Sequence, residues 1–225
     1  FFYFLFFGLF TLLHYCLFIE WHVEVVAVLL GNFDAFYYLL YPLAYWYVRA
    51  MLKVKVHFSG YDWFHLLPFV IQFLDMLPYT FSTFAHKLEV AELVKLDVHE
   101  LVKQKFGFFL STRFHFYVKL ILSSGYIFCS TRLYLLNRPV RPKNFILHFW
   151  IPGFLVLQVL LVLFLVYFFL IVPNPEQYKL TYQGNTPWNY LGLGSYLVFS
   201  LSVFYFPEFL YEPYIIEERE AKLKI

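Results

Sequence analysis

The stretch NFILHFWIPGFLVLQVLLVLFLVYFFLIVPNP, from Asn144 to Pro175, contains no Asp, Glu, Lys or Arg. A helix needs about 20 predominantly apolar residues to cross the roughly 30 Å hydrocarbon core of a bilayer. Two other windows are equally free of charge, Phe1 to Ile19 and Leu180 to Pro207. These three windows predict membrane-spanning helices and therefore an all-α protein.

The composition of the whole chain supports this interpretation. Of its 225 residues, 61% are hydrophobic and only 14% are charged, whereas soluble domains carry about 25% charged residues. This balance excludes intrinsic disorder and a disulfide-stapled miniprotein. The net charge of +2 also excludes a strong basic field that would attract nucleic acid to the chain itself.

Three weaker windows complete a polytopic bundle of six predicted spans. They are Ala35 to Leu52, Trp63 to Thr80 and Phe106 to Thr131. Between the last two windows, Phe81 to Lys105 places apolar residues at helical spacing and charged residues on the other faces. That pattern predicts an amphipathic helix on the membrane surface.

The distribution of basic residues predicts the orientation. Six spans put both chain ends on one side, and that side carries ten of the 17 Lys and Arg, against five on the other. Basic loops stay on the cytoplasmic side, so we expect a multi-pass protein of the cytoplasmic membrane with a cytoplasmic C-terminus. Residues 1–211 would form the bundle, and residues 212–225 a cytoplasmic juxtamembrane linker.

A polar stripe runs along the predicted span Phe106 to Thr131. Its members recur every three or four residues and therefore share one helix face: Thr112, His115, Lys119, Ser123 and Tyr126. Lys119 and Asp75 each lie about 18 Å from the cytoplasmic ends of their spans, which suggests a buried pair with His115 one turn away. Asp75, His115, Lys119 and Ser123 are therefore the candidates for sensing a ligand or signal. The alternatives are a structural ion pair, or side chains that extend to opposite interfaces.

Signatures of catalysis are lacking. His99-Glu100 begins like a zinc-peptidase motif, but Lys103 occupies the position of the second His, so two imidazoles cannot meet at one metal. There is no phosphate-binding loop, no C-x-x-C pair and no nucleophile elbow in the sequence. The sequence predicts no catalytic residue, no metal and no cofactor.

Three stretches resemble the membrane region of bacterial AraC-type transcription regulators: PLAYWYVRAML from Pro42, WFHLLPF from Trp63 and FPEFLY from Phe206. The residues that carry the likeness are Pro42, Tyr47, Arg49, His65, Pro68, Pro207 and Glu208. Family members usually have Gly before the Pro, where this chain has Tyr41. The resemblance implies a fragment of a bundle of about seven helices, followed by a cytoplasmic helix-turn-helix domain that lies outside this sequence.

That resemblance implies a sensing and anchoring region that couples an envelope signal, or a small molecule, to DNA binding by the absent domain. A homodimer would match a DNA site with two half-sites. From the residues themselves, we expect Pro42 near a helix start, Arg49 as a charged anchor at the cytoplasmic face, and His65 as a cap or a contact of the neighbouring basic loop. The alternative function is a small-solute or ion transporter or channel that uses the polar stripe. An integral-membrane enzyme ranks last.

Overall fold

The computed structural model describes residues 2–16, 22–52, 59–97, 100–137, 145–166 and 194. In these residues all regular structure is helical, which confirms the all-α prediction. The helices are α1 (Phe2–Tyr15), α2 (Val23–Leu29), α3 (Tyr37–Met51), α4 (Leu67–Asp75), α5 (Leu77–Thr80), α6 (Phe84–Leu96), α7 (Glu100–Lys103), α8 (Thr112–Asn137) and α9 (Phe145–Val166). Two 3₁₀ helices, η2 (Asp34–Phe36) and η3 (Gly60–Leu66), precede α3 and α4.

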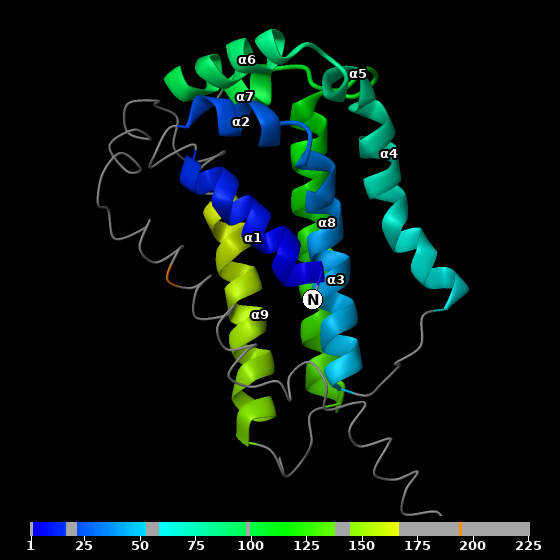
Figure 1. The fold of residues 1–225 in the computed structure, drawn as a ribbon. Helices are drawn as coiled ribbons and strands as arrows, with labels where there is room; N and C mark the ends of the chain where they lie inside the picture. The colour runs from blue at the N-terminus through cyan, green and yellow to red at the C-terminus, as the bar shows by residue number, and fades with distance from the viewer. Residues whose placement is uncertain are drawn as a thin grey trace, which may run out of the picture.

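Helices α3, α4, α8 and α9 run lengthwise through the molecule and form a bundle that α1 crosses (Figure 1). α3 and α8 run parallel, because Tyr38 contacts His115 near their starts and Tyr45 contacts Tyr126 further along. α4 and α9 run the opposite way, so that Asp75 at the end of α4 meets the first turn of α8. Helices α2, α6 and α7 lie across the end at which α8 begins. We call these three helices the cap.

Two apolar cores hold the bundle and the cap. Between α1, α3 and α9, the core includes Phe10, Val48 and Phe154, and the last two side chains are fully buried. Under the cap, Ala27 of α2 packs with Ala91 of α6 in the second core. Burial of each large apolar side chain stabilises the fold by about 1.5–3 kcal/mol.

The amphipathic helix expected within Phe81 to Lys105 exists as α6 followed by α7. The buried side chains of α6 are Val90, Ala91 and Val94, and they belong to the core that α6 shares with α2. The apolar side chains of this segment therefore pack inside the protein, where they join α6 to α2 within the cap. Its position relative to a membrane stays a prediction.

Gly31 makes the sharp turn between α2 and η2 with a φ of 75°. This left-handed conformation is costly for residues with a Cβ atom. A Cβ atom here would also lie 2.7 Å from Cδ1 of Tyr79. The turn brings Asp34 to the start of α3, where the polar residues of the bundle gather.

The described helices do not support the prediction of six membrane spans, and they also differ from the predicted spans in their boundaries. Helix α8 begins at Thr112 and not at Phe106, because the chain before it forms a loop that Asp75 holds. No described helix is by itself long and apolar enough to cross a membrane. The two segments Val23–Leu29 and Asp34–Met51, which meet at a bend of 60°, together have the length and apolar composition of a span. The window Leu180 to Pro207 lies outside the described residues, apart from residue 194, and so does the linker 212–225.

Candidate functional site

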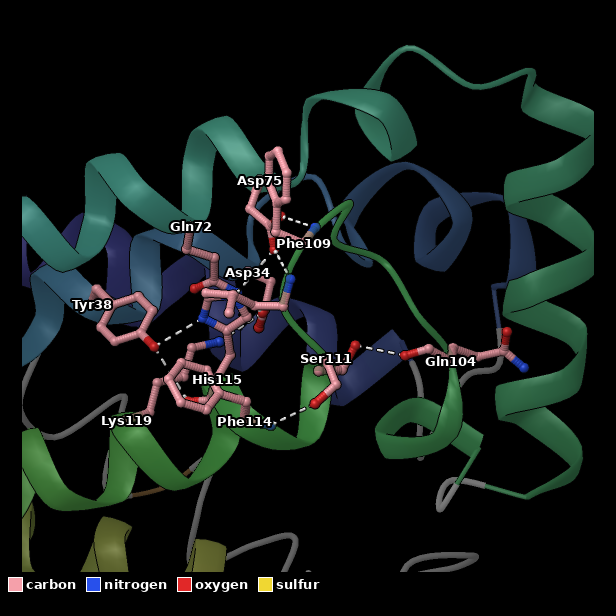
Figure 2. Close-up of polar contacts among 12 residues, drawn as sticks. Asp34, Tyr38, Gln72, Asp75, Gln104, Phe109, Ser111, Phe114, His115 and Lys119 are labelled. Atoms are coloured by element: carbon pink, nitrogen blue, oxygen red, sulfur yellow. Dashed lines mark hydrogen bonds and ion pairs between the residues drawn. The ribbon is translucent and has the colours of Figure 1, made fainter.

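Six polar side chains meet where the start of α8 faces α3 and α4 (Figure 2). We call them the polar cluster: Asp34 of η2, Tyr38 of α3, Gln72 and Asp75 of α4, and His115 and Lys119 of α8. Four of the six, Tyr38, Gln72, Asp75 and His115, are at most 5% exposed. Buried charged groups are costly unless they are paired or hydrogen-bonded, so their contacts decide what this cluster does.

Asp75 fastens the loop that leads into α8. Its carboxylate accepts hydrogen bonds from the backbone N–H of Phe109 at 2.6 Å and of Leu110 at 3.3 Å, and its carbonyl accepts one from Phe108 N at 3.0 Å. Gly107 permits this approach, because a Cβ atom there would lie 2.8 Å from Asp75 Cγ. The end of α4 and the start of α8 are therefore held as one unit.

His115 lies between Asp75 and Tyr38. Its Nε2 is 3.4 Å from Asp75 Oδ2, and its Nδ1 is 3.0 Å from the Tyr38 hydroxyl oxygen. A neutral imidazole that carries its proton on Nε2 satisfies both contacts, since Nε2–H donates to the carboxylate and Nδ1 accepts from Tyr38. The Tyr38 oxygen also lies 3.4 Å from the carbonyl oxygen of His115.

The predicted pairing of Lys119 with Asp75 is wrong, because Lys119 Nζ contacts Asp34 Oδ2 at 2.6 Å. Gln72 also donates to Asp34 Oδ2, and the Lys119 ammonium lies 5.4 Å from the ring centre of Tyr38. The error came from the boundary of α8. Asp75 ends α4 opposite the first turn of α8, at the level of His115, whereas Lys119 lies one turn further along.

The other members of the predicted stripe also contact neighbouring polar groups. Thr112 donates to the carbonyl of Gln104 at 2.6 Å, and the Tyr126 hydroxyl lies 2.6 Å from Nδ1 of His65. Ser123 is 1% exposed and donates to the carbonyl of Leu120 at 2.9 Å. Polar contacts thus follow α8 from the cap towards the opposite end of the bundle.

A second polar group lies at that opposite end. Arg49 donates to both carboxylate oxygens of Asp62, at 2.7 and 3.2 Å, and Asp62 also accepts from the backbone N–H and the hydroxyl of Ser59. The Arg49 guanidinium beside Asp62 holds the pKa of that carboxyl well below its usual range. Arg49 is only 8% exposed, so the expectation of an anchor extending to the interface is wrong: Asp62 offers it a buried carboxylate.

The remaining residues of the resemblance occupy defined places, except Pro207 and Glu208, which lie outside the described residues. Pro42 lies inside α3 and not at its start, because η2 and the first turn of α3 precede it. Pro68 is in the first turn of α4, where its missing N–H does no harm. Tyr47 accepts a hydrogen bond from Trp150 Nε1 at 2.6 Å.

His65 contacts two polar side chains among the described residues. Its Nε2 lies 4.0 Å from Asp62 Oδ1, while its Nδ1 contacts Tyr126 of α8. His65 therefore joins the second polar group to the end of the α8 stripe. The basic residues of the neighbouring loops, at 53–58 and 138–144, lie outside the described residues, so a contact with them stays a prediction.

Sequence reasoning missed Asp34, Tyr38, Gln72 and Asp62. The first three come together only through the turn at Gly31 and the packing of α4. Asp62 carried a local signal, because Ser59 and Asp62 have the S-x-x-D spacing of a capping box, and the structure shows that box at η3.

Comparison with known proteins gives no further guide, since the chain matches no protein-family model, no curated protein and no solved structure. The resemblance to AraC-type regulators therefore stays a prediction. Within the described ranges, no three His, Cys, Asp or Glu side chains are arranged to hold a metal ion. What the polar cluster offers chemically is an ion pair and an imidazole between a carboxylate and a hydroxyl.

Proposed function

We propose that these helices form a membrane-embedded sensing and anchoring region of the cytoplasmic membrane, with the cap on the outer side. In this proposal the bundle transmits an envelope signal from the polar cluster along α8 to the cytoplasmic side. The observation that carries it is the distribution of polar and apolar side chains in α4 and α8.

Helix α4 buries its polar side chains and exposes its apolar ones. Gln72 and Asp75 are its only buried residues, and they are also its only polar residues. Its exposed large side chains are Leu67, Val70, Ile71, Phe73 and Leu74, each 40–57% exposed. A helix in water has the opposite arrangement, whereas in a bilayer polar groups face the bundle interior.

Helix α8 also buries polar side chains and exposes large apolar ones, together with Arg113, Ser124 and Arg132. Its buried residues are His115, Ser123 and Ser130, all of them polar. Its exposed large side chains are Phe114, Tyr117, Ile121, Phe128, Leu135 and Leu136, between 46% and 71% exposed. Leaving the exposed part of each side chain in water forgoes about 1–2 kcal/mol, and lipid contact removes this penalty.

The sensing part of the proposal is supported by the way in which α8 joins the two ends of the bundle. This helix has 26 residues and is therefore about 39 Å long. It contacts the polar cluster near its start and, through Tyr126 just past its middle, His65 beside the second polar group. A signal acts only if it binds one packing of the helices better than another, and a rotation or shift of α8 would change both groups together.

The resemblance to the membrane region of AraC-type regulators supports an assignment of what the signal controls. On that basis the bundle controls a cytoplasmic helix-turn-helix domain, and DNA is bound only through that domain. Dimerisation suits a DNA site with two half-sites. The bundle itself then has no catalytic role. Its partners are the bilayer and a second copy of the chain.

Two measurements on the full-length gene product test this proposal. First, the protein should stay in the membrane pellet after extraction at alkaline pH, and recovery in the supernatant would refute membrane embedding. Second, a reporter gene under the control of the full-length protein should lose its response to envelope stress when Lys119→Met breaks the cluster. Glu92→Gln, at an exposed position on α6, is the matched control and should leave the response intact.

Transport through the bundle is the second candidate, and the polar contacts along α8 favour it. The two candidates differ in one measurement, the flux of ions or protons into liposomes that contain the purified protein. Flux that Lys119→Met abolishes would favour transport, while tight liposomes with an intact reporter response favour sensing.

A further inference from the structure

The polar cluster is one positive charge short when His115 is neutral. Asp34 and Asp75 contribute two carboxylates, and Lys119 contributes one ammonium group, which Asp34 holds at 2.6 Å. Among the described residues Asp75 has no such cation, since the backbone N–H groups of Phe109 and Leu110 are neutral donors. A buried charge is stabilised by an opposite charge nearby, and the side chain beside Asp75 that can supply one is His115.

Tyr38 is placed to serve both protonation states of His115. Its hydroxyl oxygen lies 3.0 Å from Nδ1 and 3.4 Å from the carbonyl oxygen of the same residue. With neutral His115, the hydroxyl donates to Nδ1. With an imidazolium, Nδ1–H donates to the hydroxyl oxygen, and the hydroxyl proton turns to the carbonyl oxygen, which has a second lone pair. No hydrogen bond is lost in either state.

We propose that His115 is a proton-binding site and that the proton is the signal to which this bundle responds. The second half rests on the proposed sensing function, while the first half does not. The proton comes from water and forms a bond with Nδ1, and no other proton leaves the cluster. The side chain changes from a neutral imidazole to an imidazolium flanked by Asp75 and Tyr38.

The groups that face His115 from each neighbouring element set the balance of this equilibrium. Burial opposes the imidazolium, since His115 is 4% exposed, and so does Lys119 one turn along α8. Asp75 of α4 and Asp34 of η2 favour the imidazolium, and Tyr38 of α3 accepts its new N–H. Acidification therefore fills the site.

Protonation of His115 changes the hold of α4 on α8. The contact of 3.4 Å between Nε2 and Asp75 Oδ2 becomes a charge-assisted hydrogen bond, which is shorter and stronger. The same oxygen accepts the N–H of Leu110 at 3.3 Å. The oxygen has lone pairs for both donors, so proton binding tightens the contact between the end of α4 and the start of α8.

The test is an NMR titration of the full-length protein in nanodiscs, with ¹⁵N-labelled histidine. The chain has eight histidines, and His115→Gln identifies the signal by its loss. We expect the His115 signal to change from the neutral Nε2–H form to the imidazolium as the pH is lowered. A signal that stays neutral, or stays charged, at every pH at which the protein remains folded would overturn the site.

Tyr38→Phe should lower the midpoint of this titration by about one pH unit, because the charge-assisted bond that the imidazolium loses is stronger than the neutral bond that the imidazole loses. Tyr37→Phe is the matched control, since it removes the hydroxyl of the neighbouring residue, which is not among the contacts of His115, and should leave the midpoint unchanged. Asp75→Asn should also lower the midpoint, through loss of the facing charge. Equal midpoints in wild type and Tyr38→Phe would overturn the role of the hydroxyl.

A reporter assay separates the two halves of the inference. If acidification changes the output of the wild type but not of His115→Gln, the proton is the signal. If His115 titrates as expected but wild type and His115→Gln respond alike to pH, the proton site is upheld and its role as the signal is overturned.

Discussion

Gly107→Ala should break the hydrogen bonds by which Asp75, at the end of α4, holds the loop before α8. A Cβ atom at this position would lie 2.8 Å from Asp75 Cγ and 2.7 Å from the carbonyl oxygen of Leu110, where ordinary contacts are about 3.5–4.0 Å. The Leu110 carbonyl belongs to the backbone and cannot rotate away. The carboxylate of Asp75 must then leave the loop, or the loop must leave the carboxylate.

The expected cost follows from the hydrogen bonds that are lost. Asp75 accepts one backbone N–H at 2.6 Å and another at 3.3 Å, and a bond to a charged group contributes about 1.5–3 kcal/mol. Loss of the shorter bond and weakening of the longer one should lower the free energy of unfolding by about 3 kcal/mol. The clash is partly with the carboxylate, so the cost should fall by about half when Asp75→Ala is already present.

Unfolding in mixed micelles with increasing SDS, followed by circular dichroism, measures this change. Gly125→Ala is the matched control, because a Cβ atom there meets no atom within 4 Å. Gly125 lies inside α8, and alanine in a helix is favoured over glycine by up to about 1 kcal/mol. The reasoning is refuted if the two variants change stability alike, or if Gly107→Ala lies within about 0.5 kcal/mol of wild type.

Two more predictions concern the ion pairs. In double-mutant cycles, Asp34→Asn with Lys119→Met should show a coupling of about 2 kcal/mol, larger than that of Asp75→Asn with Lys119→Met; equal couplings would contradict the pairing seen here. Arg49→Met should destabilise the protein by about 3 kcal/mol near neutral pH, because it leaves Asp62 buried without its cation. Since Arg49 lowers the pKa of Asp62 in the folded state, the pair stabilises the wild type fully above about pH 4 and progressively less below it. The stability of Arg49→Met should therefore approach that of wild type as the pH falls from about 5 to about 2, and parallel curves would show that the pair does not contribute.

The sequence predicts the helices better than it predicts their contacts. Apolar windows locate α1, α3 and α9. The windows over α1 and α9 contain no charge, and such long runs have few alternatives to a buried helix. The three- and four-residue spacing of the α8 stripe predicts that Thr112 and Tyr126 share a face, and both contact other polar groups in the structure. These features are local, so the sequence contains them.

The partners of the charged residues are not local. Lys119 and Asp34 are 85 residues apart in the chain, and they meet only because Gly31 turns the chain at the start of α3. Asp75 lay one turn from its predicted level because the loop before α8 is defined by hydrogen bonds to Asp75 itself. A sequence pattern cannot predict such contacts, because the position of each partner depends on the other.

Lipid exposure of α4 tests the central claim most directly. A spin label at position 71, where Ile71 is 46% exposed, and another at position 92 on the cap can be introduced after Cys16 and Cys129 are replaced. The account predicts that, in nanodiscs, the label at 71 collides several times more often with dissolved oxygen than with a water-soluble nickel chelate, and that the label at 92 shows the reverse. Frequent collisions of the nickel chelate with the label at 71 would contradict membrane embedding.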